Sequence, residues 1–164
     1  MKQELRQHLP PIILVFFLVS LFWVIKGVAP FQFIYLFFGL AWGAFILDLD
    51  HLIYWFYLKP SLEESRLAQF ALKNKDFSSL IKLLESTHKN HTSLIFHHYF
   101  FQIILALISI FVFTSSDSVF AKSFLLAINI HLLVDQIHDF RHQPKHLQKW
   151  LFARERHQLS LKYL

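Results

Sequence analysis

The chain has 164 residues, of which 55% are hydrophobic and 20 are phenylalanine, and its mean hydropathy is +0.42. A soluble domain of this length could not bury so much apolar surface, which favours a single integral membrane domain. The absence of cysteine excludes disulfides and thiolate metal sites. The formal net charge of +5 fits basic cytoplasmic loops and contact with anionic membrane lipids, and we expect no nucleic-acid partner.

The first predicted membrane span covers about residues 11–29, after a short polar start. A basic start followed by an apolar run also describes a signal peptide. Pro30 directly follows Val28-Ala29, the only small-residue site, and this argues against cleavage. We therefore expect an uncleaved anchor.

The second predicted span, 31–58, is longer than a bilayer needs and carries Asp48, Asp50 and His51. Charged groups at membrane depth are costly unless they are paired or hold a metal. Asp48 lies seventeen residues after Phe31, about 25 Å along a helix, which places it near the far edge of the hydrocarbon layer.

The polar connection 59–93 is predicted to hold amphipathic helices on the membrane surface, with a solvated linker as the alternative. Pro60-Ser61 with Glu64 is typical of a capping box that starts a helix reaching about Leu72. Asp76 is a candidate N-cap for a second helix.

The remaining spans are predicted over 94–113 and 119–140, followed by a cytoplasmic tail, 141–164. The fold class is therefore all-α, a four-helix transmembrane bundle with a cytoplasmic amphipathic loop and tail. Lys and Arg gather in the N-terminus, the long loop and the tail, which places both termini on the cytoplasmic side.

Polar residues from three of these spans are expected at one depth. In this topology Asp48, His97, His131 and Asp135 all fall near the cytoplasmic face. Asp48 shares a helix face with His51, and His131 shares one with Asp135. Helix bundles build metal sites from such inward-facing carboxylates and imidazoles. The sequence therefore predicts a metal site at the cytoplasmic end of the bundle.

Asp50 is the residue whose role is open. In an ideal helix it points nearly opposite to Asp48, so either the helix is distorted or Asp50 supports a ligand or acts as the catalytic general base. Mixed nitrogen and oxygen ligands suit zinc first, with manganese or iron as alternatives, and the set could hold one or two ions. Metal-activated water attacking an ester, phosphoester or amide is the chemistry expected of such a site.

The motifs resemble a known family. Asp48-Leu49-Asp50-His51, the segment Leu94-Ile-Phe-His-His and His131-Leu-Leu-Val-Asp135 look like the membrane-bound metal-dependent hydrolases named for LexA-regulated inner-membrane members. That family is similar in its Pro-Asp-x-Asp-His, Thr-His-Ser and His-x-x-x-Asp elements. The resemblance implies a prokaryotic inner (cytoplasmic) membrane location and metal ligation by six residues: Asp48, Asp50, His51, His97, His131 and Asp135.

The sequence departs from the family pattern in two places. Leu47 stands where the family tends to have proline. The middle element is ambiguous, because His97 precedes another histidine, whereas His91-Thr92-Ser93, with His88 nearby, offers a scrambled alternative. We prefer His97 because it falls inside the predicted span, and we expect His88 and His91 to be interfacial.

His138 and Asp139 continue the polar stripe of the fourth span and are predicted either to support the site or to form an exposed face. The leading function is a hydrolase at the cytoplasmic membrane surface that acts on a lipid-like substrate. A non-catalytic structural or regulatory membrane protein is the alternative. A metal or proton transporter is disfavoured, because the outer halves of the first and third spans carry almost no polar residues. The oligomeric state is left open.

Overall fold

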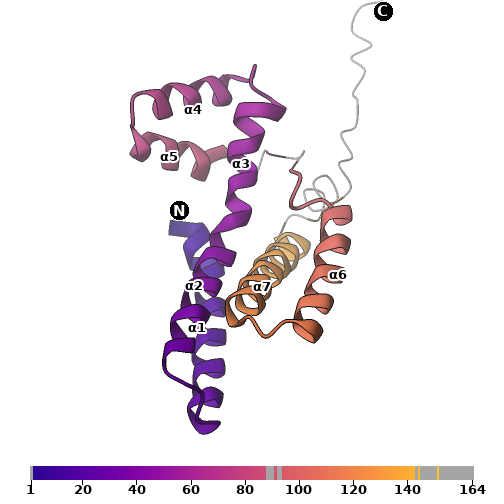
Figure 1. Cartoon of the computed structure of the whole chain (residues 1–164). Coiled ribbons are helices and arrows are strands. Elements are labelled where there is room, and N and C mark those ends of the chain that lie inside the picture. The colour runs from indigo at the N-terminus through magenta and orange to yellow at the C-terminus, as the bar shows by residue number, and fades with distance from the viewer. Residues whose placement is uncertain (1, 88–90, 92–93, 143, 145–150, 152–164) are drawn as a thin grey trace, which may run out of the picture.

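The computed structural model describes residues 2–87, 91, 94–142, 144 and 151, and these contain helices and no strand (Figure 1). The predicted all-α class is therefore confirmed. The four long helices are α1 (Lys2–Ile25), α2 (Phe31–Phe45), α6 (Tyr99–Ser115) and α7 (Val119–His142).

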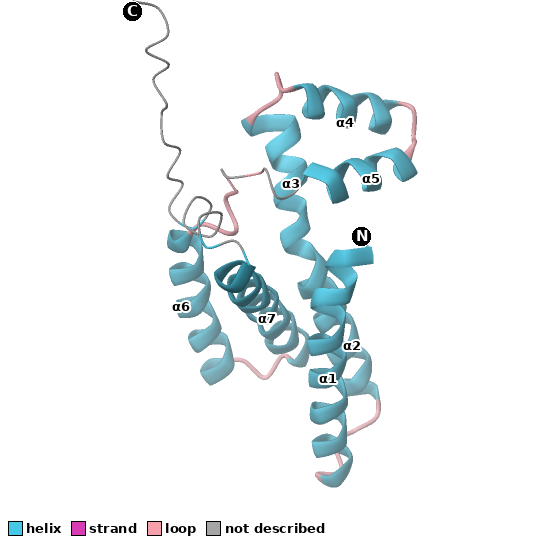
Figure 2. Ribbon diagram, turned by 180° about the vertical axis from the view of Figure 1, so that it is seen from behind, coloured by secondary structure: helices cyan, strands magenta, loops and turns pink. Residues whose placement is uncertain are grey.

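A tight turn makes α1 and α2 antiparallel neighbours (Figures 1 and 2). The turn needs glycine because Gly27 has φ +66°, and the Val28 N–H closes it by donating to the Trp23 carbonyl at 3.0 Å. α1 differs from the predicted span 11–29, since it begins at Lys2 and ends at Ile25.

The second predicted span forms one helical run that is irregular where its charged residues lie. α2 is followed by a 3₁₀ turn (η1, Ile46–Asp48), a short α-helix (α3, Leu49–Ile53) and a π-helical turn (η2, Tyr54–Leu58). The helix distortion that was one of the two alternatives for Asp50 is therefore present. It changes the directions of the side chains at the end of the run that carries the site.

Close packing of α2 on α7 holds this run in place. Gly39 and Gly43 lie so near α7 that an added methyl group would overlap it, at Ser123 in the first case and at the Phe124 carbonyl in the second. Such small residues let two helix backbones approach closely. The packing brings Ala44 and its neighbours beside the residues of α7 that carry polar groups.

The long connection folds into a helical hairpin of α4 (Glu63–Lys73) and α5 (Phe77–Thr87). The predicted capping box is wrong, because the N-cap is Leu62 and it makes no side-chain bond. The predicted cap at Asp76 is confirmed: its carboxylate accepts hydrogen bonds from the Ser79 hydroxyl at 2.6 Å and the Ser79 N–H at 3.0 Å. These bonds, the hydroxyl first, lower the pKa of Asp76.

Two helical runs, Phe31–Leu58 and Val119–His142, are long and apolar enough to cross a membrane by length and composition. The other two apolar helices, Leu9–Ile25 and Tyr99–Ser115, are shorter, so the four-span bundle stays a prediction. The span predicted over 94–113 is helical only from Tyr99, which places His97 in the turn before α6. The predicted tail lies mostly outside the described residues.

Candidate metal centre

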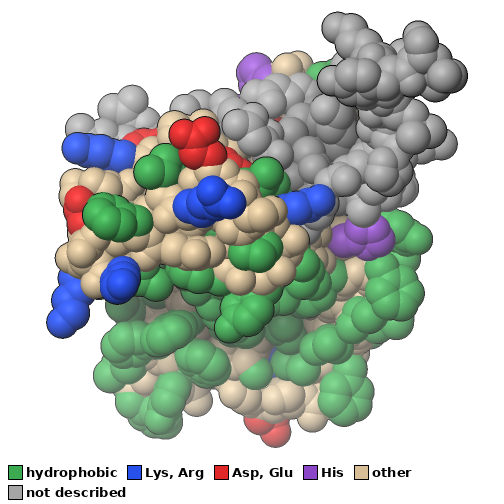
Figure 3. All heavy atoms as spheres, turned by 90° about the horizontal axis from the view of Figure 1, so that it is seen from above, with side chains coloured by type: hydrophobic (Ala, Val, Ile, Leu, Met, Phe, Trp, Pro, Cys, Tyr) green, Lys and Arg blue, Asp and Glu red, His purple; other side chains and the backbone are tan. Residues whose placement is uncertain are grey.

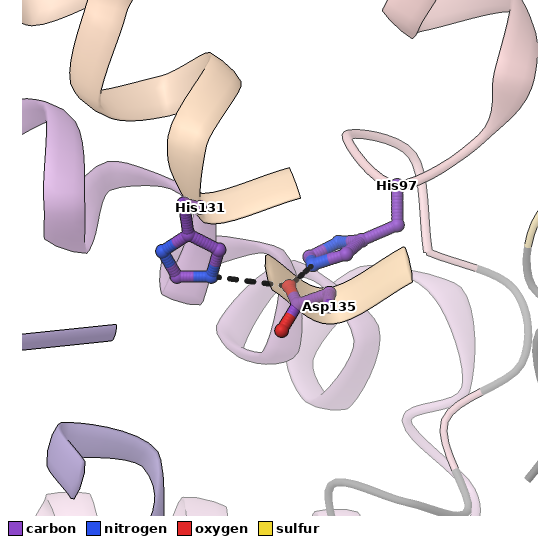
Figure 4. A group of neighbouring side chains, drawn as sticks. All are labelled: His97, His131 and Asp135. Carbon is purple, nitrogen blue, oxygen red and sulfur yellow. Dashed lines mark ion pairs between the residues drawn. The ribbon is translucent and has the colours of Figure 1, made fainter. Parts of the chain in front are cut away.

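His97, His131 and Asp135 each offer one ligand atom, and these atoms all lie within 4.8 Å of one another (Figure 4). Nε2 of His97 is 3.4 Å and Nε2 of His131 is 3.3 Å from Oδ2 of Asp135. Both imidazoles are buried, and the carboxylate is partly exposed. Asp48 lies at the edge of this group, with its Oδ1 4.0 Å from His131 Nε2. The structure therefore brings His97, His131 and Asp135 together, with Asp48 beside them.

The ring of His131 is oriented by the backbone of α2. Its Nδ1 lies 2.7 Å from the carbonyl oxygen of Ala44, directly before the irregular part of the helix. A carbonyl oxygen can only accept a hydrogen bond, so Nδ1 carries the hydrogen. A neutral ring in this state has its lone pair on Nε2, which is the nitrogen that faces Asp135.

Asp50 orients His97 from the opposite side. Its Oδ2 lies 3.2 Å from His97 Nδ1, and the same carboxylate accepts the backbone N–H groups of Ile95, at 3.0 Å, and Phe96, at 2.6 Å. These bonds hold residues 95–97 in a turn, which explains why α6 starts only at Tyr99. A carboxylate behind a histidine fixes the orientation of a metal ligand and raises its basicity. Asp50 is thus outside the group of three ligand atoms, and its catalytic role stays a prediction.

We expect Asp50→Asn to weaken zinc binding roughly 10–100-fold, the usual cost of losing the partner behind a metal-binding histidine. The amide keeps the shape of the side chain and removes its charge. Competition with a chromophoric chelator measures the affinity, with Asp117→Asn, an exposed carboxylate in the turn between α6 and α7, as the control. An affinity equal to that of the wild type would exclude the orienting role.

The charge state of His97 follows from its two carboxylates. Burial lowers the pKa of His97, but its hydrogen bonds to Asp135 and Asp50 and their negative charges outweigh this and raise the pKa to about 9. The metal-free protein therefore keeps a proton on His97 at neutral pH. A metal ion at Nε2 must displace that proton.

Metal binding is therefore expected to release about one proton from His97 at neutral pH and to strengthen as the pH rises. The increase in metal affinity with pH ends at the raised pKa of His97, about 9, because above that pH the ring is already neutral. Titration calorimetry at pH 7.5 in buffers of different ionisation enthalpy counts the proton. A binding enthalpy that is independent of the buffer would contradict the protonated state.

His51 lies next to this group and faces His91. The two Nδ1 atoms are 2.6 Å apart, and Nε2 of His91 is 3.5 Å from a carboxylate oxygen of Glu64. His91 is fully buried and stacks on Tyr54, with ring centroids 4.1 Å apart. Tyr54, Trp55 and Glu64 therefore enclose His91, and its position at the membrane interface stays a prediction.

The last two candidates lie further along α7. His138 Nδ1 is 3.3 Å from the carboxylate of Asp139, and the His138 ring stacks on that of His142 at 4.6 Å. Their supporting role at the site stays a prediction. His88 lies outside the described residues.

The sequence interpretation missed the Ala44 carbonyl, Glu64 and the burial of His91. A backbone carbonyl has no signature in a sequence. The aromatic residues Tyr54 and Trp55, one helical turn after His51, were an available signal, because they share a helix face with it and enclose His91.

The donor set fits a transition metal. Two imidazole nitrogens and a carboxylate oxygen are the ligands of catalytic zinc sites and of non-haem iron sites, and both keep open positions. The chain matches no protein-family model, no curated protein and no solved structure. The similarity to the inner-membrane hydrolases therefore remains a resemblance carried by the three motifs.

Proposed function

We propose that the chain is an integral membrane protein that binds a divalent transition metal ion, zinc first, through His97, His131 and Asp135 and hydrolyses a phosphoester or ester. The observation that carries the proposal is the convergence of two oriented Nε2 atoms on one carboxylate oxygen. Each imidazole is held from behind, by Asp50 or by the Ala44 carbonyl.

The protein supplies a preorganised set of ligands, two buried imidazoles and a partly exposed carboxylate. When bound, a divalent ion lowers the pKa of water and stabilises negative charge on a substrate oxygen. Asp48 has 40% of its side chain exposed and lies at the edge of the group, where its carboxylate can accept a hydrogen bond from water or from a substrate hydroxyl. His131 and His97 keep their orientation because their Nδ1 atoms are already occupied.

The surface of the chain supports a location in a membrane. Large apolar side chains are exposed on all four long helices, among them Phe17, Phe37, Phe111 and Leu133. Water would disfavour so much exposed apolar surface, whereas lipid tails solvate it. Figure 3 shows Lys and Arg side chains over the α4–α5 hairpin, seen from the end at which the hairpin lies. Basic residues at this end favour a cytoplasmic orientation, with the site at the membrane surface and a lipid-like substrate.

A screen of the zinc-loaded protein in detergent micelles tests this function. The substrates are p-nitrophenyl phosphate, p-nitrophenyl acetate and a short-chain phosphatidic acid. We expect turnover that a chelator abolishes, that added zinc restores and that Asp135→Ala removes. A protein that binds zinc stably but hydrolyses none of these esters would contradict the hydrolase and favour the structural alternative.

A further inference from the structure

Four imidazoles form a row that passes through the candidate metal centre. The ring centroids of His131 and His97 are 6.3 Å apart, those of His97 and His51 are also 6.3 Å apart, and those of His51 and His91 are 4.9 Å apart. Two of the rings, His131 and His97, have Nδ1 held and Nε2 directed to the ligand group. The other two, His51 and His91, contribute none of the three converging ligand atoms.

The contact between His51 and His91 fixes where their hydrogens lie. Two nitrogen lone pairs repel at 2.6 Å, so one of the facing Nδ1 atoms must carry a hydrogen. The carboxylate of Glu64 lies 3.5 Å from the other nitrogen of His91, an ion-pair distance without hydrogen-bond geometry, and its negative charge favours the hydrogen there, on Nε2. A neutral imidazole has a single N–H. In a neutral His91, Nδ1 is then the acceptor, and His51 Nδ1 is the donor.

We infer that Glu64 and His91 are positioning residues that hold His51 in its Nδ1–H form, which leaves the hydrogen off Nε2 of a ring whose centroid lies 6.3 Å from that of His97. The inference rests on the proposed function only for the use of this nitrogen. There, His51 Nε2 would take a proton from water or bind a second ion. His97 and His131 are oriented in the same way, through a partner at Nδ1. For His51 the partner is His91, which Glu64 contacts in turn, and we call these three residues the relay.

The surroundings of His91 make the relay rigid. Its ring stacks on Tyr54 with an interplanar angle of 21°, and Trp55 packs against its edge with centroids 5.6 Å apart. α4 brings Glu64 to this ring, and the Ser65 hydroxyl ties α4 to the preceding run through the Lys59 carbonyl at 2.7 Å. The His91 ring therefore lies between Glu64 of the hairpin and His51.

The tautomer of His51 can be read directly from long-range proton–nitrogen spectra of metal-free protein labelled with ¹⁵N-histidine, in detergent. His51→Gln assigns the signals. We expect the Nδ1–H form in the wild type. His91→Phe keeps the aromatic stacking and removes the acceptor, so the Nδ1–H population should fall. His91→Asn restores an acceptor near the same position and should recover it.

A second pair of variants leaves the buried ring of His91 unchanged. Glu64→Ala removes the carboxylate that sets the His91 tautomer, whereas Glu63→Ala changes the exposed neighbouring residue on α4. The first should lower the Nδ1–H population of His51, and the second should leave it unchanged. An Nε2–H form in the wild type, or a population that none of these variants moves, overturns the relay. Zinc binding is measured separately, so its absence would reject the proposed function while leaving the tautomer result readable.

Discussion

Replacing His131 with alanine is expected to reduce the bound zinc from about one equivalent per chain to background, because three protein ligands are the usual minimum of a catalytic site. His131 supplies one of three converging ligand atoms from a buried ring. Losing only the group behind a histidine costs roughly 10–100-fold in affinity, so losing the ligand itself should cost more. Elemental analysis of the purified protein after removal of loosely bound metal measures the difference.

The control for this experiment is His138→Ala, in the same helix. His138 is also a partly buried histidine beside a carboxylate, but its described partners are Asp139 and His142. It should keep the wild-type zinc content. Equal zinc in the wild type and both variants, whether high or negligible, is incompatible with a metal ligated by His131.

Replacing Gly43 with leucine is expected to destabilise the protein by about 1–3 kcal/mol or more, the usual range for overpacking. Even a methyl group there would overlap the Phe124 carbonyl and lie 2.8 Å from the Ala127 side chain, and backbone atoms of α7 cannot rotate away. α2 and α7 must therefore separate. The shift also moves the Ala44 carbonyl that orients His131, so zinc affinity should fall in the same variant.

Thermal unfolding in detergent, monitored by the circular dichroism signal of the helices, measures the loss of stability. Ala106→Leu is the matched control, because it adds a comparable side chain at an exposed position of α6. It should leave both the midpoint and the zinc affinity unchanged. A Gly43→Leu variant with wild-type stability would show that α2 and α7 do not pack as described.

The sequence predicted the helical class, the two longest apolar runs and the meeting of Asp48, His97, His131 and Asp135. These succeeded because hydropathy and residue counting along a helix depend only on local geometry. The predicted start of the third span was wrong, because the Asp50 carboxylate accepts hydrogen bonds from the N–H groups of Ile95 and Phe96, which are far from it in the sequence. No local pattern carries such a contact.

The positions of Asp50 and His91 also depend on tertiary contacts that no local sequence pattern predicts. The 3₁₀ turn at Ile46–Asp48 redirects the side chains after it, and no glycine or proline within that turn signals it. His91 lies in a polar segment, so composition gave no sign that Tyr54 and Trp55 would bury it. The residues that orient the ligands were therefore harder to predict than the ligands.

X-ray absorption at the zinc edge of the loaded protein tests the central claim most directly. The structure predicts nitrogen and oxygen ligands at about 2.0–2.2 Å. It also predicts the outer-shell scattering of two imidazoles, from His97 and His131, which falls to one in His131→Ala at saturating zinc. A spectrum with oxygen ligands alone, or with imidazole scattering that His131→Ala leaves unchanged, would contradict a metal centre at these residues.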